Sequence, residues 1–89
     1  MNSDESSLMT FPHDYPLKVM GRNNDEFRSL VLGIAQKHMG PIDLALIEER
    51  PSNNGTYLGL TLIVRATSKA QLDALYMELT ACEKVMVAL

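Results

Sequence analysis

The residues best suited to chemistry lie where the first predicted strand gives way to the first predicted helix. Gly21 and Arg22 follow the strand, and Arg28 stands six positions after Arg22. A glycine lets the backbone approach a ligand closely, and the planar guanidinium of arginine matches the oxygens of a phosphate. An anion-binding loop is therefore the first hypothesis to weigh.

Acylphosphatases hold a phosphate with glycines and an arginine at this place in the chain. A small enzyme of that kind, using Arg22 and Arg28, is our alternative function. The segment between the two arginines argues against it, because it lacks an internal glycine and contains Asp25 and Glu26, which would repel a phosphate. No base or orienting acid accompanies Cys82, so we predict no catalytic residue and a protein that is not an enzyme.

Metal and cofactor binding have no support in the sequence. His13 and His38 lie on different predicted elements, and Cys82 is the only cysteine. A chain without a disulfide suits a reducing compartment, and the N-terminus lacks the basic and apolar segments of an export signal. We expect a cytoplasmic protein with no metal, no cofactor and no membrane association.

The net charge and its distribution argue against nucleic acid as a partner. The chain carries a net charge of −3, its pI is near 5.2, and no cluster of Lys and Arg stands out. RNA-binding sheets of the RRM type also stack bases on several aromatic side chains, whereas the outward face predicted below offers only Tyr57.

Two helices are predicted from their caps and apolar stripes. Asn23 is the expected N-cap of the first, with Glu26 three residues later, and Gly40-Pro41 ends it. Ser68 is the expected N-cap of the second. The stripes that should face the core are Phe27, Leu30, Val31 and Ile34 in the first helix, and Leu72, Leu75, Tyr76 and Leu79 in the second.

Four strands are predicted around these helices, at Leu17–Gly21, Ile42–Arg50, Thr56–Ala66 and Lys84–Leu89. When the sequence is aligned with itself at an offset of 45 positions, residues of the same character fall on one another in the two halves of the chain. Val19, for example, aligns with Val64. Two tandem βαβ units form an α+β, ferredoxin-like βαββαβ sandwich, in which two helices cover one face of a four-stranded antiparallel sheet. Residues 1–10 are expected to be a flexible tail, and residues 11–89 a single domain.

The other face of this sheet has nothing left in the chain to cover it. Leu44, Leu46, Val85, Val87 and Leu89 are predicted to join the central-strand residues that face the helices. An exposed, partly apolar strip of this kind often marks an interaction site. The predicted interaction surface consists of Lys18, Met20, Ile47, Tyr57, Thr61, Ile63, Arg65 and Met86.

The turn before the third strand leaves two registers open. A two-residue Asn54-Gly55 loop pairs Ile47 with Leu62 and turns Ile47 into the core. A three-residue loop that begins at Asn53 pairs Leu46 with Leu62 and keeps Leu44 and Leu46 inside. We favour the three-residue loop, with Gly55 left-handed, or a five-residue loop of the same parity.

The chain resembles a known family from about residue 9 to its end. The opening Phe11-Pro12 and Tyr15 to Gly21, the histidine near the end of the first helix, the Pro51-Ser52 turn and the V-x-M-V-like ending are similar to the YbeD-like family of small bacterial proteins. The resemblance implies a fold similar to ACT regulatory domains and no established activity. ACT domains bind small effectors near a glycine after the first strand, which implies Gly21, Arg22 and Asn23 as a ligand loop.

We therefore predict a non-enzymatic regulatory or interaction module. Its expected partners are a second copy of the chain or another protein, docked on the outward sheet face, and a small-molecule effector near Gly21.

Overall fold

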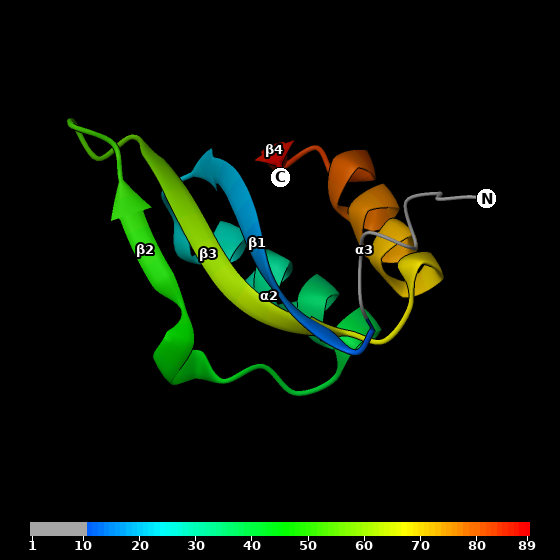
Figure 1. The fold of residues 1–89 in the computed structure, drawn as a ribbon. Helices are drawn as coiled ribbons and strands as arrows, with labels where there is room; N and C mark the ends of the chain where they lie inside the picture. The colour runs from blue at the N-terminus through cyan, green and yellow to red at the C-terminus, as the bar shows by residue number, and fades with distance from the viewer. Residues whose placement is uncertain (1–10) are drawn as a thin grey trace.

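The structure, a computed structural model, describes residues 11–89. The elements in chain order are β1 (His13–Arg22), α2 (Asp25–Met39), the short 3-10 helix η1 (Leu44–Leu46), β2 (Glu48–Pro51), β3 (Tyr57–Ala66), α3 (Lys69–Ala81) and β4 (Val85–Ala88). The strands form one antiparallel sheet in the order β2-β3-β1-β4 (Figure 1). The predicted α+β sandwich is confirmed, and the tail predicted at residues 1–10 lies outside the described residues.

The core fills the space between the two central strands and the two helices. Alternate residues of β1 and β3 point toward the helices, so both strands bury one side chain in two. The predicted helix stripes are confirmed, with Leu30 and Tyr76 only partly buried. The most deeply buried large side chains are Leu17, Val19, Phe27, Val31, Leu58, Leu62, Val64, Leu75 and Leu79.

The helix caps agree with the sequence except at one position. Ser68 caps α3 by accepting a hydrogen bond from the Gln71 amide, and Gly40 ends α2 with φ of 79°. The predicted N-cap Asn23 is wrong by one residue, because Asn24 accepts from the Phe27 amide at 2.8 Å. The Asn23 side chain instead donates to the Gly55 carbonyl, which links α2 to the turn before β3.

The second strand begins later than predicted. Asp43 accepts a hydrogen bond from the Ala45 amide and opens the short helix η1, so the chain becomes a strand only at Glu48. Leu44 and Leu46 are 61% and 55% exposed, so their predicted place in the core is wrong.

The turn before β3 shows why the predicted register fails. Ser52 donates its amide hydrogen to the Tyr57 carbonyl, which encloses four residues, 53–56. This even-numbered loop has the same parity as the two-residue alternative, and it pairs Glu48 with Thr61. Ile47 therefore packs against the core, and its predicted place on the outward face is wrong. Gly55 is left-handed, with φ of 79°, as expected.

A bulge reverses the faces of the last strand. Gly21 pairs with Val85 and Met20 with Val87, so Met86 is an extra residue opposite this step. One extra residue shifts every following side chain to the other face. Val85 and Ala88 pack against the core, whereas Val87 and Leu89 are exposed. The predicted inward positions of Val87 and Leu89 are therefore wrong.

The two helices are joined by a polar cluster at the end of α2. Glu78 on α3 lies 2.7 Å from His38 Nε2 and 3.0 Å from Lys37 Nζ, and Gln71 donates to the His38 carbonyl. The hydrogen bond to His38, and then the one to Lys37, hold the pKa of the Glu78 carboxyl below its usual value. Nearby, burial raises the pKa of the Tyr76 phenol, and the neighbouring Tyr15 adds to the effect.

Replacing Glu78 with glutamine should destabilise the fold in a pH-dependent way. The carboxyl has a lower pKa folded than unfolded, so it contributes stability above the unfolded value of 4.5 and loses it as the pH falls. We expect Glu78→Gln to have a lower melting temperature at pH 7 and to approach the parent protein between about pH 5 and pH 3. Thermal unfolding followed by circular dichroism across this pH range measures the difference in melting temperature. The control is Asp73→Asn, which changes an exposed acid of α3 in the same way. A difference that persists unchanged at pH 3 would contradict the cluster's role.

Candidate functional site

The sheet face opposite the helices is uncovered in the described residues. Strand alternation and register place one set of side chains on it, which we call the open face. Its members are Asp14, Pro16, Lys18, Met20, Arg22, Glu48, Arg50, Tyr57, Gly59, Thr61, Ile63, Arg65, Val87 and Leu89.

Two adjacent rows form the centre of the open face. Thr61 has Glu48 on one side and Lys18 on the other, and Lys18 exchanges two backbone hydrogen bonds with Leu89. In the next row, Arg50, Gly59, Met20 and Val87 lie side by side. Because Gly59 has no side chain, the rows enclose a shallow hollow of about 270 Å³ with an apolar wall toward β4 and a charged wall toward β2.

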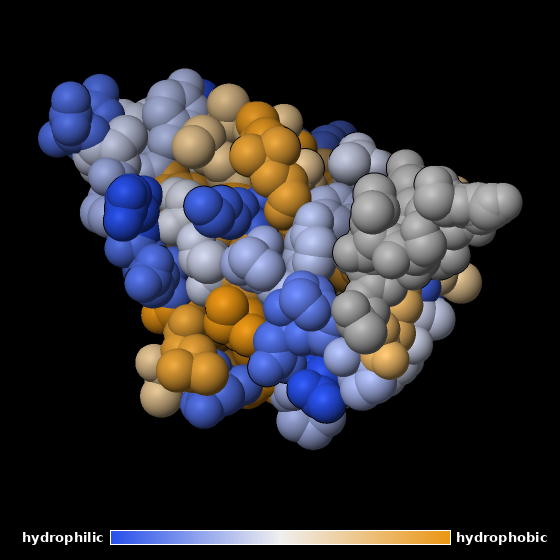
Figure 2. Space-filling view, viewed as in Figure 1, coloured by the Kyte–Doolittle hydropathy of each residue, from blue (hydrophilic) through white to orange (hydrophobic). Residues whose placement is uncertain are grey.

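Four large apolar side chains of this face are exposed. The exposed fractions of Met20, Ile63, Val87 and Leu89 run from 37% at Ile63 to 66% at Leu89. Figure 2 looks onto this face and shows apolar surface in two areas, one near β4 and one around η1, with polar surface between them. Apolar surface gathered in this way, and bordered by polar side chains, is typical of interaction sites.

Most of the predicted interaction surface lies on the open face. Lys18, Met20, Thr61, Ile63 and Arg65 point outward, and Arg65 pairs with Asp14 at 3.1 Å. Tyr57 also points outward, but the Arg22 guanidinium lies over its ring at 5.8 Å. Met86 is the extra residue of the β4 bulge and is exposed.

Besides central-strand residues such as Arg22 and Gly59, the predicted interaction surface omits Glu48, Arg50, Val87 and Leu89. Glu48 and Arg50 belong to the open face because of the hairpin register, and Val87 and Leu89 because of the bulge. The Asn54-Gly55 pair was the available signal for the first two, since a loop of even length turns Glu48 and Arg50 outward. No residue type in β4 indicates that the strand contains a bulge.

The predicted ligand loop serves the packing of the fold. A Cβ atom on Gly21 would lie 2.4 Å from Phe27 Cε1 and 2.6 Å from the Lys84 carbonyl oxygen, so the helix and β4 fill the space beside this glycine. Arg22 stacks on Tyr57, and Asn23 bonds to the turn at Gly55. An effector at Gly21, Arg22 and Asn23 stays a prediction.

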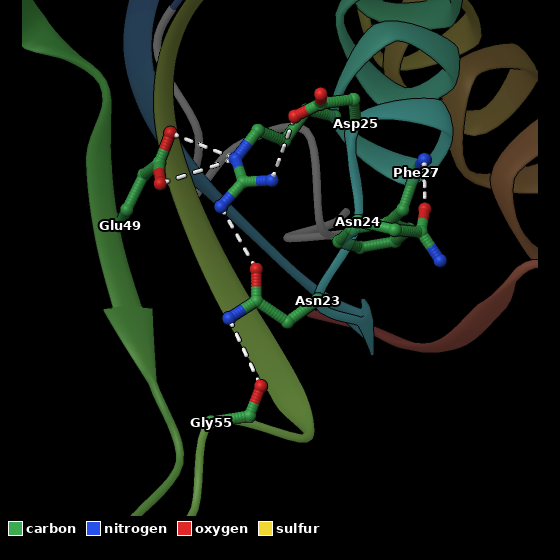
Figure 3. Close-up of polar contacts among 7 residues, drawn as sticks. Asn23, Asn24, Asp25, Phe27, Glu49 and Gly55 are labelled. Carbon is green, nitrogen blue, oxygen red and sulfur yellow. Dashed lines mark hydrogen bonds and ion pairs between the residues drawn. The ribbon is translucent and has the colours of Figure 1, made fainter.

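Arg28 is surrounded by acceptors from three segments. Its Nε donates to both carboxylate oxygens of Glu49 at 3.2 Å, and its Nη1 lies 3.3 Å from Asp25. Its Nη2 donates to Asn23, and Figure 3 shows how Asn23 continues this chain of bonds to Gly55. All three guanidinium nitrogens are thus bound within the fold, and two carboxylates stand where a phosphate would have to bind.

Charge is distributed unevenly between the two sides of the protein. The β1 and β3 register also places Asp14 outward beside Arg65. Within residues 11–89, the outward side of the sheet carries Lys18, Arg22, Arg50 and Arg65 against Asp14 and Glu48, a net of +2. Residues 11–89 carry eight Lys and Arg against nine Asp and Glu, a net of −1, so the rest of these residues carries −3. Apart from the Asp14–Arg65 pair, the outward charges form no ion pair with another described residue.

No helix within residues 11–89 is long and apolar enough to cross a membrane. In the same range, no three His, Cys, Asp or Glu side chains are grouped so that they could hold a metal ion.

Comparison with known proteins identifies the family. Residues 6–89 match the family described as "Protein of unknown function (DUF493)". The chain belongs to this family. Among DUF493 relatives, a UPF0250 protein of Ralstonia nicotianae is 48% identical over 93% of this chain and 86% of its own. One from Paraburkholderia phytofirmans is 42% identical over the full length of both chains, and one from Bordetella pertussis is 44% identical over 96% of this chain and 93% of its own.

These matches confirm the YbeD-like resemblance inferred from the sequence. They extend over the whole domain, so the open face belongs to the matched region. Neither the description of the DUF493 family nor the names of these relatives state an activity.

Proposed function

We propose that this protein is a non-enzymatic interaction module that docks a partner protein on its open face. The observation that carries the proposal is the exposed set of Met20, Ile63, Val87 and Leu89, which stands beside charges that have no partner in the described fold. Apolar anchors surrounded by polar groups are what protein interfaces use for affinity and orientation. Covering them would also help a small domain, which buries a modest share of its own surface.

An acylphosphatase-like activity has less support. It requires an arginine free to bind phosphate, whereas Arg28 is engaged by Glu49 and Asp25. Arg22 extends over Tyr57 on the opposite side of the sheet from Arg28. The two arginines do not converge on one position.

Single charged substitutions test the proposal. Ile63→Asp places a carboxylate in the open face, whereas Met77→Asp makes a comparable change at an exposed position of α3. The full-length chain and both variants are used for affinity capture from the native cell, with light scattering on each purified protein. We expect the amount of captured partner to fall at least about tenfold with Ile63→Asp, because a charge at an interface is desolvated without compensation. With Met77→Asp the amount should stay unchanged. Equal capture by all three proteins would refute the role of the open face.

A further inference from the structure

The edges of the sheet are poorly suited to adding a strand from a partner. At one edge, β2 consists of Glu48, Glu49, Arg50 and Pro51, and both charge and proline discourage edge pairing. At the other edge, the bulge at Met86 interrupts the regular ladder of β4. A partner segment on the open face must therefore satisfy its own backbone hydrogen bonds, and an α-helix does so.

The side chains of the open face indicate which residues such a helix would present to it. Its apolar side chains require an apolar stripe, and its net charge of +2 favours acidic residues on the flanks of that stripe. Lys18 and Arg50 border the hollow above Gly59, where they flank whatever side chain enters it. Neither has an ion-pair partner among residues 11–89.

From these features we infer that the open face binds an acidic amphipathic helix of a partner protein. The inference rests on the proposed function and names the kind of segment that the face accepts. The helix would lay its apolar stripe on Met20, Ile63 and Val87 and direct its carboxylates toward Lys18 and Arg50.

Two other occupants fit the observations less well. Two copies of the chain packed face to face would bring two surfaces of net +2 together, which is unfavourable. RNA would find a single aromatic ring on the open face, Tyr57, already covered by Arg22, and a chain whose net charge of −3 repels a polyanion.

Site-specific cross-linking in the native cell, followed by binding measurements, tests the inference. A photo-cross-linking amino acid replaces Thr61 at the centre of the open face or, as control, Gln36 on the exposed side of α2. Mass spectrometry locates the cross-linked segment, and a synthetic peptide of that segment is titrated with the full-length protein. The variants are Lys18→Glu/Arg50→Glu and, with the same change in net charge away from the open face, Lys69→Glu/Lys84→Glu.

We expect a cross-link from Thr61 to an acidic segment with apolar residues at helical spacing. The affinity of its peptide for Lys18→Glu/Arg50→Glu should be at least about tenfold lower than for the parent protein. The affinity for the control pair should stay within about twofold of the parent value, and binding to the parent should weaken as the salt concentration rises. A cross-link from Thr61 to a basic or uncharged segment, to RNA or to a second copy of this chain would overturn the inference and leave the open face as a docking site. Equal cross-linking from Thr61 and Gln36 would instead overturn the proposed function itself.

Discussion

Replacing Gly21 with alanine is expected to destabilise the protein by about 3 kcal/mol or more, because the new methyl group has no space. Its Cβ atom would lie 2.4 Å from Phe27 Cε1 and 2.6 Å from the Lys84 carbonyl oxygen. Phe27 is buried in the core, and Lys84 leads into β4, which pairs with β1 at this glycine. Relief of the clash must therefore move the helix, the edge strand or both.

Chemical denaturation of the full-length protein measures this loss, and Gly33→Ala provides the matched control. Gly33 lies within α2, and a Cβ atom there would have no neighbour within 4 Å. Alanine favours a helix over glycine by about 1 kcal/mol, so Gly33→Ala should stabilise the fold. Opposite signs for the two substitutions are expected. A Gly21→Ala protein as stable as its parent would show that Phe27 and the Lys84 carbonyl do not close around Gly21 as described.

The second large effect is expected at Ile47, where the substitution Ile47→Asn should cost about 1–3 kcal/mol. Ile47 packs against the core because the four-residue loop pairs Glu48 with Thr61. Asparagine removes the buried apolar area and places an amide among apolar neighbours. It also carries no charge, so nearby Arg28 offers no compensating ion pair.

Leu46→Asn is the control, since Leu46 is the adjacent residue and 55% exposed. Its substitution should change the free energy of unfolding by less than about 0.5 kcal/mol. Urea titrations of both variants decide between the two registers of the hairpin. A destabilised Leu46→Asn beside an unaffected Ile47→Asn would restore the register that the sequence had favoured.

The central strands and the helices could be predicted because each carries a redundant signal. Leu58, Leu60, Leu62 and Val64 alternate with outward residues over the length of β3, and any one of them could be lost without changing the pattern. The helices combine an apolar stripe with a capping residue at each start. Misplacing the first cap by one residue, from Asn24 to Asn23, had no effect on the predicted packing.

The edge strands could not be predicted as well because they are short and their faces depend on single residues. β2 and β4 have four residues each, too few for alternation to establish a face. Asp43 caps a 3-10 turn that takes up Leu44 and Leu46, which follow it, and one extra residue at Met86 reverses the faces of β4. Such local events are decided by backbone hydrogen bonding, which the apolar pattern does not report.

The wrong predictions for β2 and β4 directly affect the candidate site. The central members, Lys18, Met20, Thr61 and Ile63, followed from alternation in β1 and β3. The charges of Glu48 and Arg50 and the apolar wall of Val87 and Leu89 became visible only with the observed registers. The hollow and the net positive charge of the open face are therefore properties of the fold.

The role of the open face is tested most directly by NMR of the isotope-labelled full-length protein titrated with its captured partner. The proposal predicts that amide signals of Lys18, Met20, Thr61 and Ile63 shift or broaden while those on the exposed sides of α2 and α3 stay in place. Changes confined to α2 and α3, with the open-face signals unmoved, would contradict it.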